Sequence, residues 1–416
     1  GLNIKEGQIS NPYDGQLFLY DPATRKAKAL TKDFNPNVID AVWNRFNGQI
    51  YILCEDEDYQ RIYTCDPANG KIKQVAASED IIMSYALADN APVLFYYGQS
   101  ASNANRLYAY DLKGGKNRLV YDLSQDKLKD IALGEVHDWN FKSDDGTTIQ
   151  GRYYLPPHFD PNKKYPIISV VYPGPYFGFV PTSFSLSERY CDRMAQLGFI
   201  VIAVGHRGDS PMRGKAYHRF GYGNMRDYPL ADDKYVIEQL AKRHSYIDID
   251  KVGICGHSGG GFMAAASLLT YPDFYKAAVS CSGNHDNSIY NRGWGECYNG
   301  VREVEKVVKD SLGNEKKEYE YKFSVKSNAE LAKNLKGNLM LVTGDMDKNV
   351  NPAHTYRLAQ ALIEAGKDFD MLVIPGAGHG YGSADEYFEK KMFRFFAKHL
   401  LGDTRSDYWG DINRNK

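Results

Sequence analysis

A serine lies in the glycine-rich segment Gly256-His257-Ser258-Gly259-Gly260, between an apolar run at 252–255 and a helix-like stretch at 260–270. A strand, a sharp turn and a helix in this order are typical of a serine whose hydroxyl is exposed for nucleophilic attack. Glycines two residues to either side remove side chains that would collide at such a turn. The N-terminus of the new helix favours negative charge beside the serine. The pattern predicts that Ser258 is the nucleophile of a hydrolase.

A serine hydroxyl is a weak nucleophile, so it needs a general base and a group that orients this base. In hydrolases with this kind of turn, the acid and then the histidine follow the serine along the chain, in loops after later strands. His379 meets this requirement, because it follows an apolar run at 371–374 and is flanked by glycines. Asp345 and Asp347 both lie in the loop after the apolar run at 339–343, and position alone favours neither as the acid.

The tetrahedral intermediate of such a reaction carries an oxyanion, which about two hydrogen-bond donors must hold. One donor is expected to be the backbone N–H of Gly259, the residue after the nucleophile. The other usually comes from the loop after an earlier strand, here the loop at 172–176. The two prolines of this loop have no N–H to donate. The Tyr172 hydroxyl and the Gly174 N–H are therefore the candidates.

The elements that must position these residues alternate along the second part of the chain. Strand candidates span 166–172, 199–204, 252–255, 277–281, 339–343 and 371–374. Helix candidates span 184–196, 228–243, 260–270, 353–365 and 385–400. Apolar strands that alternate with helices indicate a mostly parallel sheet covered on both faces. Together with the serine turn, this alternation predicts an α/β-hydrolase domain over residues 136–416.

Residues 1–135 have a different pattern, in which short apolar and aromatic runs are separated by turn signals such as Asp-Pro and Asn-Gly. A similar run, followed by a turn rich in Gly, Lys or Arg, recurs near 17–27, 62–73 and 107–117, a period of about 45 residues. Repeats of this length with several strands each are typical of β-propeller blades, of which a ring needs roughly 4–8. We expect the C-terminal portion of a propeller, about three blades, with the others before residue 1; a three-unit sheet of another kind is the alternative.

Composition excludes several classes of function. Net charge is −1, which gives no basic excess for a nucleic-acid partner. The sequence contains no stretch of about 18 apolar residues, so no membrane span is expected. The six cysteines form no C-x-x-C pair, which argues against a zinc ribbon or a thioredoxin motif, and we expect neither a metal nor another cofactor. The charged run at 302–322 is interpreted as a solvated surface excursion, with a lid over the site as the less favoured alternative.

Several segments resemble the prolyl oligopeptidase family of serine peptidases, and within it the bacterial type of the dipeptidyl peptidase IV branch. The resemblance covers about 139–401 and rests on Val-Tyr-Pro-Gly-Pro at 171–175, Gly-His-Arg-Gly at 205–208, the serine turn, and Gly-Asp-Met-Asp-Lys-Asn-Val at 344–350. It implies that Asp347 is the acid and that Tyr172 is the second oxyanion donor. It also implies that substrate contacts Tyr290, Asn349, Val350 and Arg207, of which the first three line the pocket for the residue before the scissile bond.

Two departures from that branch concern the pocket. Gly259 stands where the branch commonly has tyrosine, and the segment 282–287 lacks the aromatic wall that grips proline. The paired glutamates that hold a substrate's amino terminus are also absent from the expected place, which fits missing N-terminal blades. We therefore expect an altered preference for proline.

The resemblance implies a serine peptidase that releases dipeptides from the N-termini of peptides. An oligopeptidase, an acyl-peptide hydrolase or an esterase with the same three catalytic residues is the first alternative, and a catalytically silent binding protein is the second. The expected partner is a peptide substrate, with a homodimer as a further possibility. Relatives of this kind are typically exported, which favours a periplasmic or secreted location, whereas the sequence itself leaves the compartment open.

Overall fold

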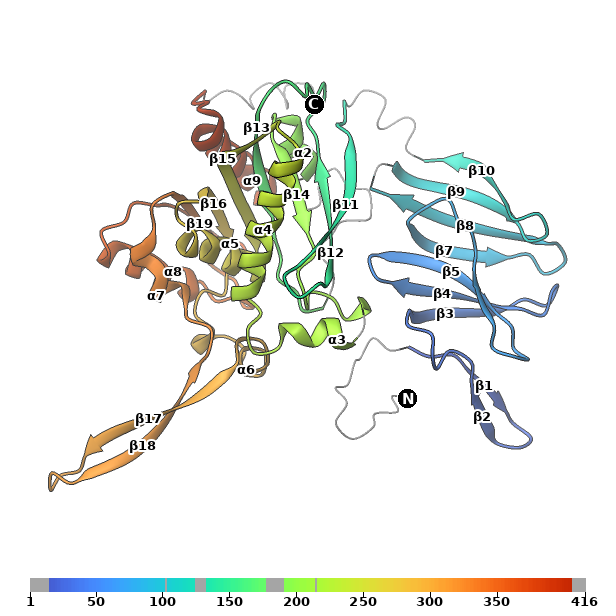
Figure 1. The fold of residues 1–416 in the computed structure, drawn as a ribbon, viewed down its shortest axis with the longest axis horizontal. Helices are drawn as coiled ribbons and strands as arrows, with labels where there is room; N and C mark the ends of the chain where they lie inside the picture. The colour runs from blue at the N-terminus through green and yellow to red at the C-terminus, as the bar shows by residue number, and fades with distance from the viewer. Residues whose placement is uncertain (1–14, 102, 124–131, 177–190, 214, 406–416) are drawn as a thin grey trace.

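The structure is a computed structural model that describes residues 15–101, 103–123, 132–176, 191–213 and 215–405. An eight-stranded sheet forms the centre of the C-terminal part (Figure 1). The strand order across it is β11 (Val136–Lys142), β12 (Thr148–Tyr154), β14 (Ile200–Val204), β13 (Tyr165–Val170), β15 (Ile247–His257), β16 (Tyr275–Cys281), β19 (Asn338–Gly344) and β20 (Asp370–Ile374). The strands from β14 to β20 are parallel, whereas β12 is antiparallel to both of its neighbours. All six runs predicted as strands lie in this sheet.

Helices cover both faces of the sheet. One face packs against α4 (Asp227–Arg243), α5 (Gly259–Thr270) and α8 (Ala353–Glu364), and the other against α2 (Cys191–Gln196) and α9 (Asp385–Phe396). Adjacent residues of a strand point to opposite faces, so Ile167 belongs to the first core and Ile168 to the second. This is the α/β-hydrolase fold that the alternation predicted; residues 184–190 of the first expected helix lie outside the described residues. Within the described ranges, no helix has the length and apolar character needed to cross a membrane.

The N-terminal part is antiparallel β structure, drawn in blue and cyan in Figure 1. The hairpin β1 (Phe18–Asp21) and β2 (Lys26–Ala29) is followed by two four-stranded meanders. The first contains β3 (Asn37–Trp43), β4 (Ile50–Asp56), β5 (Tyr59–Cys65) and β6 (Ile72–Gln74), and the second contains β7 (Ile81–Leu87), β8 (Val93–Ser100), β9 (Asn103–Asp111) and β10 (Lys116–Asp122). A single parallel bridge between Gln60 and Ile81 connects the two meanders.

The repeated sequence pattern corresponds to one recurring turn in this part. Asp21, Asp66 and Asp111 stand 45 residues apart, each at the end of a strand that leads into a hairpin. Each carboxylate accepts a hydrogen bond of 2.8–3.0 Å from the backbone N–H two residues later. This Asx-type turn explains why the pattern ends on aspartate.

Polar contacts join the turn between β4 and β5 to the hydrolase part. Asp58 forms an ion pair with Arg213, and the two side chains are only 4% and 6% exposed. Arg213 Nη2 also donates to Gln150 Oε1 of β12 (2.8 Å), and Gln150 Nε2 donates to Glu57 Oε2 (3.3 Å). Because a buried charge without its partner is costly, this pair fixes how the two parts meet locally.

Residues 301–323 form a two-stranded arm of β17 (Val301–Lys309) and β18 (Glu315–Phe323), which extends away from the hydrolase body (Figure 1). Its side chains are largely exposed, including Val307 at 58% and Tyr321 at 71%. This exposure agrees with the expected solvated surface excursion at 302–322. The regular hairpin was not predicted, because charged residues interrupt the alternation that would indicate a strand.

Glycines create the turn between β15 and α5 for a steric reason. A Cβ atom on Gly256 would lie 2.6 Å from the backbone oxygen of Val171, and one on Gly260 would lie 2.1 Å from the same oxygen. Both distances are shorter than any van der Waals contact, so α5 can approach β13 only where side chains are absent. A Cβ atom on Gly259, in contrast, would meet its nearest neighbours at 3.5 Å or more, which is ordinary contact.

We predict that Gly260→Ala destabilises the protein by about 1–3 kcal/mol, because the added methyl group forces the backbone of α5 away from β13. The matched variant Gly259→Ala adds the same methyl group to the same helix turn without a clash, and should leave stability within about 0.5 kcal/mol or raise it slightly. Urea unfolding followed by tryptophan fluorescence measures both. Equal stability of the two variants would contradict the steric account.

Candidate active site

Ser258 lies at the turn between β15 and α5, at the carboxyl edge of the sheet. Its backbone is strained, with φ of 59° and ψ of −122°, in a region that non-glycine residues rarely adopt. The Ser258 N–H donates to the carbonyl oxygen of Cys281 at the end of β16 (2.8 Å), which holds the turn against the neighbouring strand. The serine therefore stands at the N-terminus of α5, where the helix favours negative charge.

Asp347 and His379 are joined by a hydrogen bond, with 2.7 Å between Asp347 Oδ2 and His379 Nδ1. Asp347 follows β19 and His379 follows β20, so the parallel sheet brings their two loops to one edge. The Asp347 side chain is fully buried, and its Oδ1 accepts the backbone N–H groups of Asn349 and Val350, each at 2.9 Å. Because Asp347 occupies Nδ1, the Nε2 atom of His379 is the one left to exchange a proton.

Asp345, the other acidic candidate, has a different environment. It is exposed, and its Oδ1 accepts the backbone N–H of Gly376 at 2.6 Å. This bond ties the loop after β19 to the loop after β20. The structure thus gives Asp345 a loop-capping contact and gives Asp347 the contact with the histidine.

His257 connects the serine turn to His379. The two histidine rings meet edge to face with centroids 4.7 Å apart. Among the described residues, no hydrogen bond joins the Ser258 hydroxyl to the His379 ring; such bonds are often long until substrate binds. Burial, followed by the nearby His379, lowers the pKa of His257 to about 4, so its ring is neutral at neutral pH. Sequence reasoning gave His257 no role, since it fills the variable position of the turn.

Tyr172 lies directly against Gly259. A Cβ atom on Gly259 would lie 3.5 Å from Cε2 of the Tyr172 ring, so the phenol is packed beside the first turn of α5. Burial, and then Tyr290 and Tyr176, raise the pKa of Tyr172 to about 12. The hydroxyl therefore keeps its proton at neutral pH and is able to donate a hydrogen bond. The two residues expected to hold an oxyanion are thus neighbours in space.

Tyr290, Asn349 and Val350 also lie together. The Tyr290 hydroxyl donates to Asn349 Oδ1 (3.1 Å), and Val350 is buried. Because Asn349 and Val350 hold Asp347 through their backbone N–H groups, this cluster adjoins the aspartate–histidine pair. The structure therefore brings together the three residues expected to line a pocket, while their contact with substrate stays a prediction.

Arg207 belongs to a separate ionic cluster. Its Nε and Nη2 donate to the two oxygens of Asp232 (3.1 and 2.7 Å). Its Nη1 donates to Asp144 Oδ1 (2.7 Å) and lies 2.9 Å from Asp145 Oδ2. Each of its three guanidinium nitrogens already meets a carboxylate, so the structure does not gather Arg207 with Tyr290 and Asn349.

Sequence reasoning missed polar residues behind Tyr290. Its ring packs edge to face on that of His354, with centroids 5.7 Å apart, and His354 Nδ1 accepts the backbone N–H of Asp286 (3.3 Å). Asp286 Oδ2 accepts from Arg357 Nη1 of α8 (2.6 Å). Asp286 belongs to the segment 282–287, in which the sequence lacks the aromatic wall of the related branch. Polar side chains occupy this place instead. His354 lies within the helix α8, and no local motif marks the cluster.

The chain is similar to several curated proteins. Human dipeptidyl peptidase 8 is 28% identical over 66% of this chain and 29% of its own length. The dipeptidyl-peptidase 5 of Porphyromonas gingivalis is 30% identical over 59% of this chain and 35% of its own length. The present chain thus spans only about a third of these relatives.

Solved structures share the fold. The dipeptidyl peptidase 4 of Porphyromonas gingivalis superposes with a TM-score of 0.72 at 20% identity, over 92% of this chain and 53% of that one. An acylaminoacyl peptidase of Pyrococcus horikoshii superposes with a TM-score of 0.71 at 21% identity, over 92% of this chain and 59% of that one.

The sequence pattern of the Prolyl oligopeptidase family matches residues 183–403, more than half of the chain. This region contains the serine turn, both acidic candidates and His379. We conclude that the chain belongs to the prolyl oligopeptidase family.

Proposed function

We propose that the protein is a serine peptidase that cleaves peptide bonds through an acyl-enzyme, with Ser258, Asp347 and His379 as its catalytic residues. The observation that carries this proposal is the 2.7 Å contact between His379 Nδ1 and the buried carboxylate of Asp347, at the same sheet edge as the strained Ser258. An orienting acid, a base and a serine at a nucleophile turn are the parts that such chemistry needs.

In this mechanism, Ser258 Oγ attacks the carbonyl carbon of the scissile bond while His379 Nε2 takes the hydroxyl proton. The resulting oxyanion accepts hydrogen bonds from the Gly259 N–H and the Tyr172 hydroxyl. His379 then gives the proton to the leaving amine, which leaves the acyl group on Ser258. Water then attacks the carbonyl carbon of the acyl group while His379 Nε2 takes a proton from it. The bond to Ser258 Oγ breaks as His379 returns this proton to the serine oxygen. In both half-reactions Asp347 stabilises the imidazolium form of His379.

Release of dipeptides from free N-termini is the substrate mode that we favour. It is supported by the relatives named dipeptidyl peptidases. Cleavage of blocked peptides is the second candidate, since an acylaminoacyl peptidase shares the fold. In both cases Tyr290, Asn349 and Val350 would surround the residue before the scissile bond, and the polar group behind Tyr290 would lower the preference for proline. Arg207 would act indirectly, through the cluster that supports its loop.

We further propose that residues 1–135 are the end of a β-propeller that covers the site, joined to a catalytic domain over 136–416. The two four-stranded meanders and the 45-residue recurrence support this assignment. In the whole protein, the propeller would restrict access to small peptides and supply the groups that bind a free amino terminus. A homodimer is compatible with this arrangement.

The second prediction concerns the substrate. The full-length protein should hydrolyse Gly-Pro and Ala-Ala chromogenic amides with free amino termini, and should turn over the blocked versions at least about tenfold more slowly. Ser258→Ala should reduce kcat by about 10⁶-fold, because the nucleophile is lost. Better turnover of blocked amides would replace the dipeptidyl assignment with an oligopeptidase or acyl-peptide hydrolase, and a Ser258→Ala variant within tenfold of wild type would refute the mechanism.

The third prediction separates the two acidic candidates. Asp347→Asn should lower kcat by about 10³–10⁴-fold, because an amide does not stabilise the His379 imidazolium or hold its tautomer. Asp345→Asn is the matched control, since its amide oxygen can still accept the Gly376 N–H, and its kcat should stay within about threefold of wild type. Steady-state kinetics on a free-amine amide measures both, and the reverse ranking of the two variants would assign the acid to Asp345.

The fourth prediction concerns the oxyanion. Tyr172→Phe should lower kcat by about 100- to 1,000-fold with KM nearly unchanged, because the lost hydrogen bond forms only with the oxyanion. Since the pKa of Tyr172 is about 12, its hydroxyl stays protonated at lower pH. The ratio of wild-type to variant kcat should therefore be constant from pH 7 to pH 9. A loss below about fivefold would show that another donor serves the oxyanion.

A further inference from the structure

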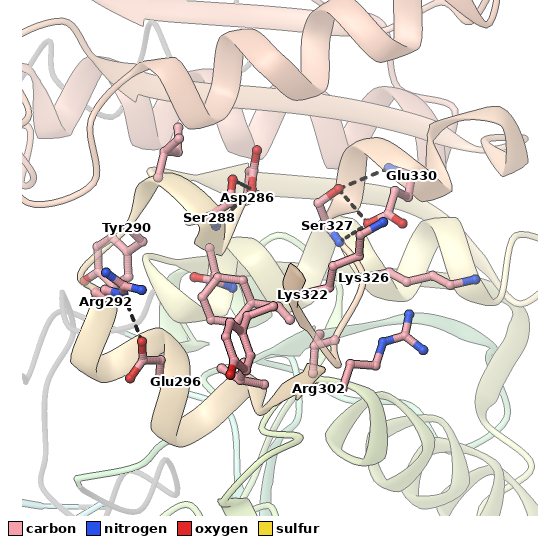
Figure 2. Close-up of a pocket in the computed structure, with 16 residues that line it drawn as sticks. Asp286, Ser288, Tyr290, Arg292, Glu296, Arg302, Lys322, Lys326, Ser327 and Glu330 are labelled. Atoms are coloured by element: carbon pink, nitrogen blue, oxygen red, sulfur yellow. Dashed lines mark hydrogen bonds and ion pairs between the residues drawn. The ribbon is translucent and has the colours of Figure 1, made fainter. Parts of the chain in front are cut away.

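A cavity of about 820 Å³ opens where the arm joins the hydrolase body (Figure 2). Its walls come from the base of β17 and β18, from η4 (Asn287–Ile289) and α6 (Arg292–Asn299), and from the segment 325–330 that leads into α7 (Asn328–Leu331). Residues from the arm therefore form part of a concave site. This is more than the solvated excursion that the charged sequence of the arm suggests.

The acidic side chains that line the cavity are already engaged. Glu296 accepts a hydrogen bond from Arg292 Nε (2.9 Å). Glu330 accepts the N–H of Ser327 (2.8 Å) in a capping box. Asp286 faces Arg357, which lies outside the cavity (2.6 Å). None of the three carboxylates is left without a hydrogen-bond donor.

The basic side chains of the cavity are less fully engaged. Lys322 pairs with Glu320 on its own strand (2.6 Å), whereas Arg302 and Lys326 have no ion-pair partner among the described residues. Figure 2 shows the Arg292–Glu296 pair on one side of the cavity and both Arg302 and Lys326 on the other. Arg302 and Lys326 thus add two positive charges to a side of the cavity that also carries one carboxylate, Glu330, and this excess of positive charge attracts an anionic group.

One residue links the loop of the proposed catalytic aspartate to this cavity. Tyr290 lines it, and the Tyr290 hydroxyl binds Asn349, two residues after Asp347. The opposite wall is anchored to α5, because Asn328 Nδ2 donates to the backbone oxygen of Phe262 (2.9 Å). The Arg226 side chain also donates a hydrogen bond from Nη1 to the carbonyl oxygen of Lys326. Both walls are therefore held by elements that position Ser258 and Asp347.

We propose that this cavity binds a carboxylate side chain of the peptide substrate, carried by the residue before the scissile bond or by a direct neighbour. The inference rests on the proposed peptidase function, because it extends the pocket that Tyr290 lines. Arg302 presents a planar guanidinium whose donors match the two oxygens of a carboxylate, and Lys326 adds a second positive charge. The arm then contributes to substrate specificity, because Arg302 belongs to its strand β17.

The test compares peptides that differ only by glutamate or glutamine, placed in turn at each position within two residues of the scissile bond. For the full-length wild type, glutamate at one position should lower KM by about two- to fivefold relative to glutamine, as expected for a carboxylate near two exposed cations. The double variant Arg302→Gln/Lys326→Gln should abolish this ratio. The ratio should also fall between 0.05 and 0.5 M salt, because exposed charges are screened.

Lys309→Gln is the matched control, since it removes a charge from the same arm at its far end, and it should keep the wild-type ratio. Arg302→Lys should recover part of the ratio. Equal KM values for glutamate and glutamine at every position, or a preference that survives in the double variant, would overturn the proposal. Glutarate that changes turnover of the glutamine peptide, without any preference for glutamate, would assign the cavity to a free carboxylate and overturn it as well.

A binding measurement separates this proposal from the peptidase function itself. Fluorescein-labelled glutamate and glutamine peptides are titrated with the Ser258→Ala variant, and their Kd values are read by anisotropy. If wild type cleaves no peptide but the variant binds the glutamate peptide more tightly, the proposed function fails and the carboxylate site stands. If wild type cleaves both peptides equally and the variant binds them equally, the function stands and the site fails.

Discussion

The buried carboxylate of Asp347 is the contact on which the rest of the candidate site depends. Its two oxygens accept three hydrogen bonds, from two backbone N–H groups of its own loop and from His379. A carboxylate without exposed surface is tolerated only when it is fully hydrogen-bonded. The same bonds that satisfy it also set the orientation of the histidine and the position of Asn349, whose side chain meets Tyr290. One interaction therefore couples the proposed proton transfer to the proposed pocket.

A second constraint acts through backbone approach rather than charge. The start of α5 comes so close to the end of β13 that only glycine fits at 256 and 260, and this closeness is what sets the Tyr172 ring against Gly259. The strained backbone conformation of Ser258 persists because hydrogen bonds to the neighbouring strands hold the turn. The Ser258 N–H donates to Cys281, and the Val171 N–H donates to Cys255. The proposed oxyanion donors are consequently set beside each other by the packing of α5 against the end of β13.

The pocket region shows how a shared fold is adapted locally. Behind Tyr290, Asp286, His354 and Arg357 form a polar group, and the cavity beyond it is completed by an arm that extends from the body of the domain. An isolated two-stranded hairpin is marginally stable in water, so its anchored base, next to Asn299 and Val325, is the part best able to contribute to a site. Similarity to solved structures at 20–21% identity describes the fold alone, so the residues of this region have to be interpreted from this sequence.

The sequence by itself determined the features that depend on short-range chemistry. The glycine spacing around Ser258, the apolar strands of the sheet and the glycine-flanked His379 were predictable, because local sterics and periodicity dictate them. The hairpin of β11 and β12 was not predicted as strands, since polar residues alternate with its buried Trp139 and Phe141. Position in the sequence left Asp347 and Asp345 equivalent, and only the family resemblance favoured Asp347; the tertiary structure gives them different partners, 32 and 31 residues away. It also decided that Arg207 is held by carboxylates from two distant segments and that the arm borders a cavity. Such contacts join residues far apart along the chain, so only the packing of the whole domain specifies them.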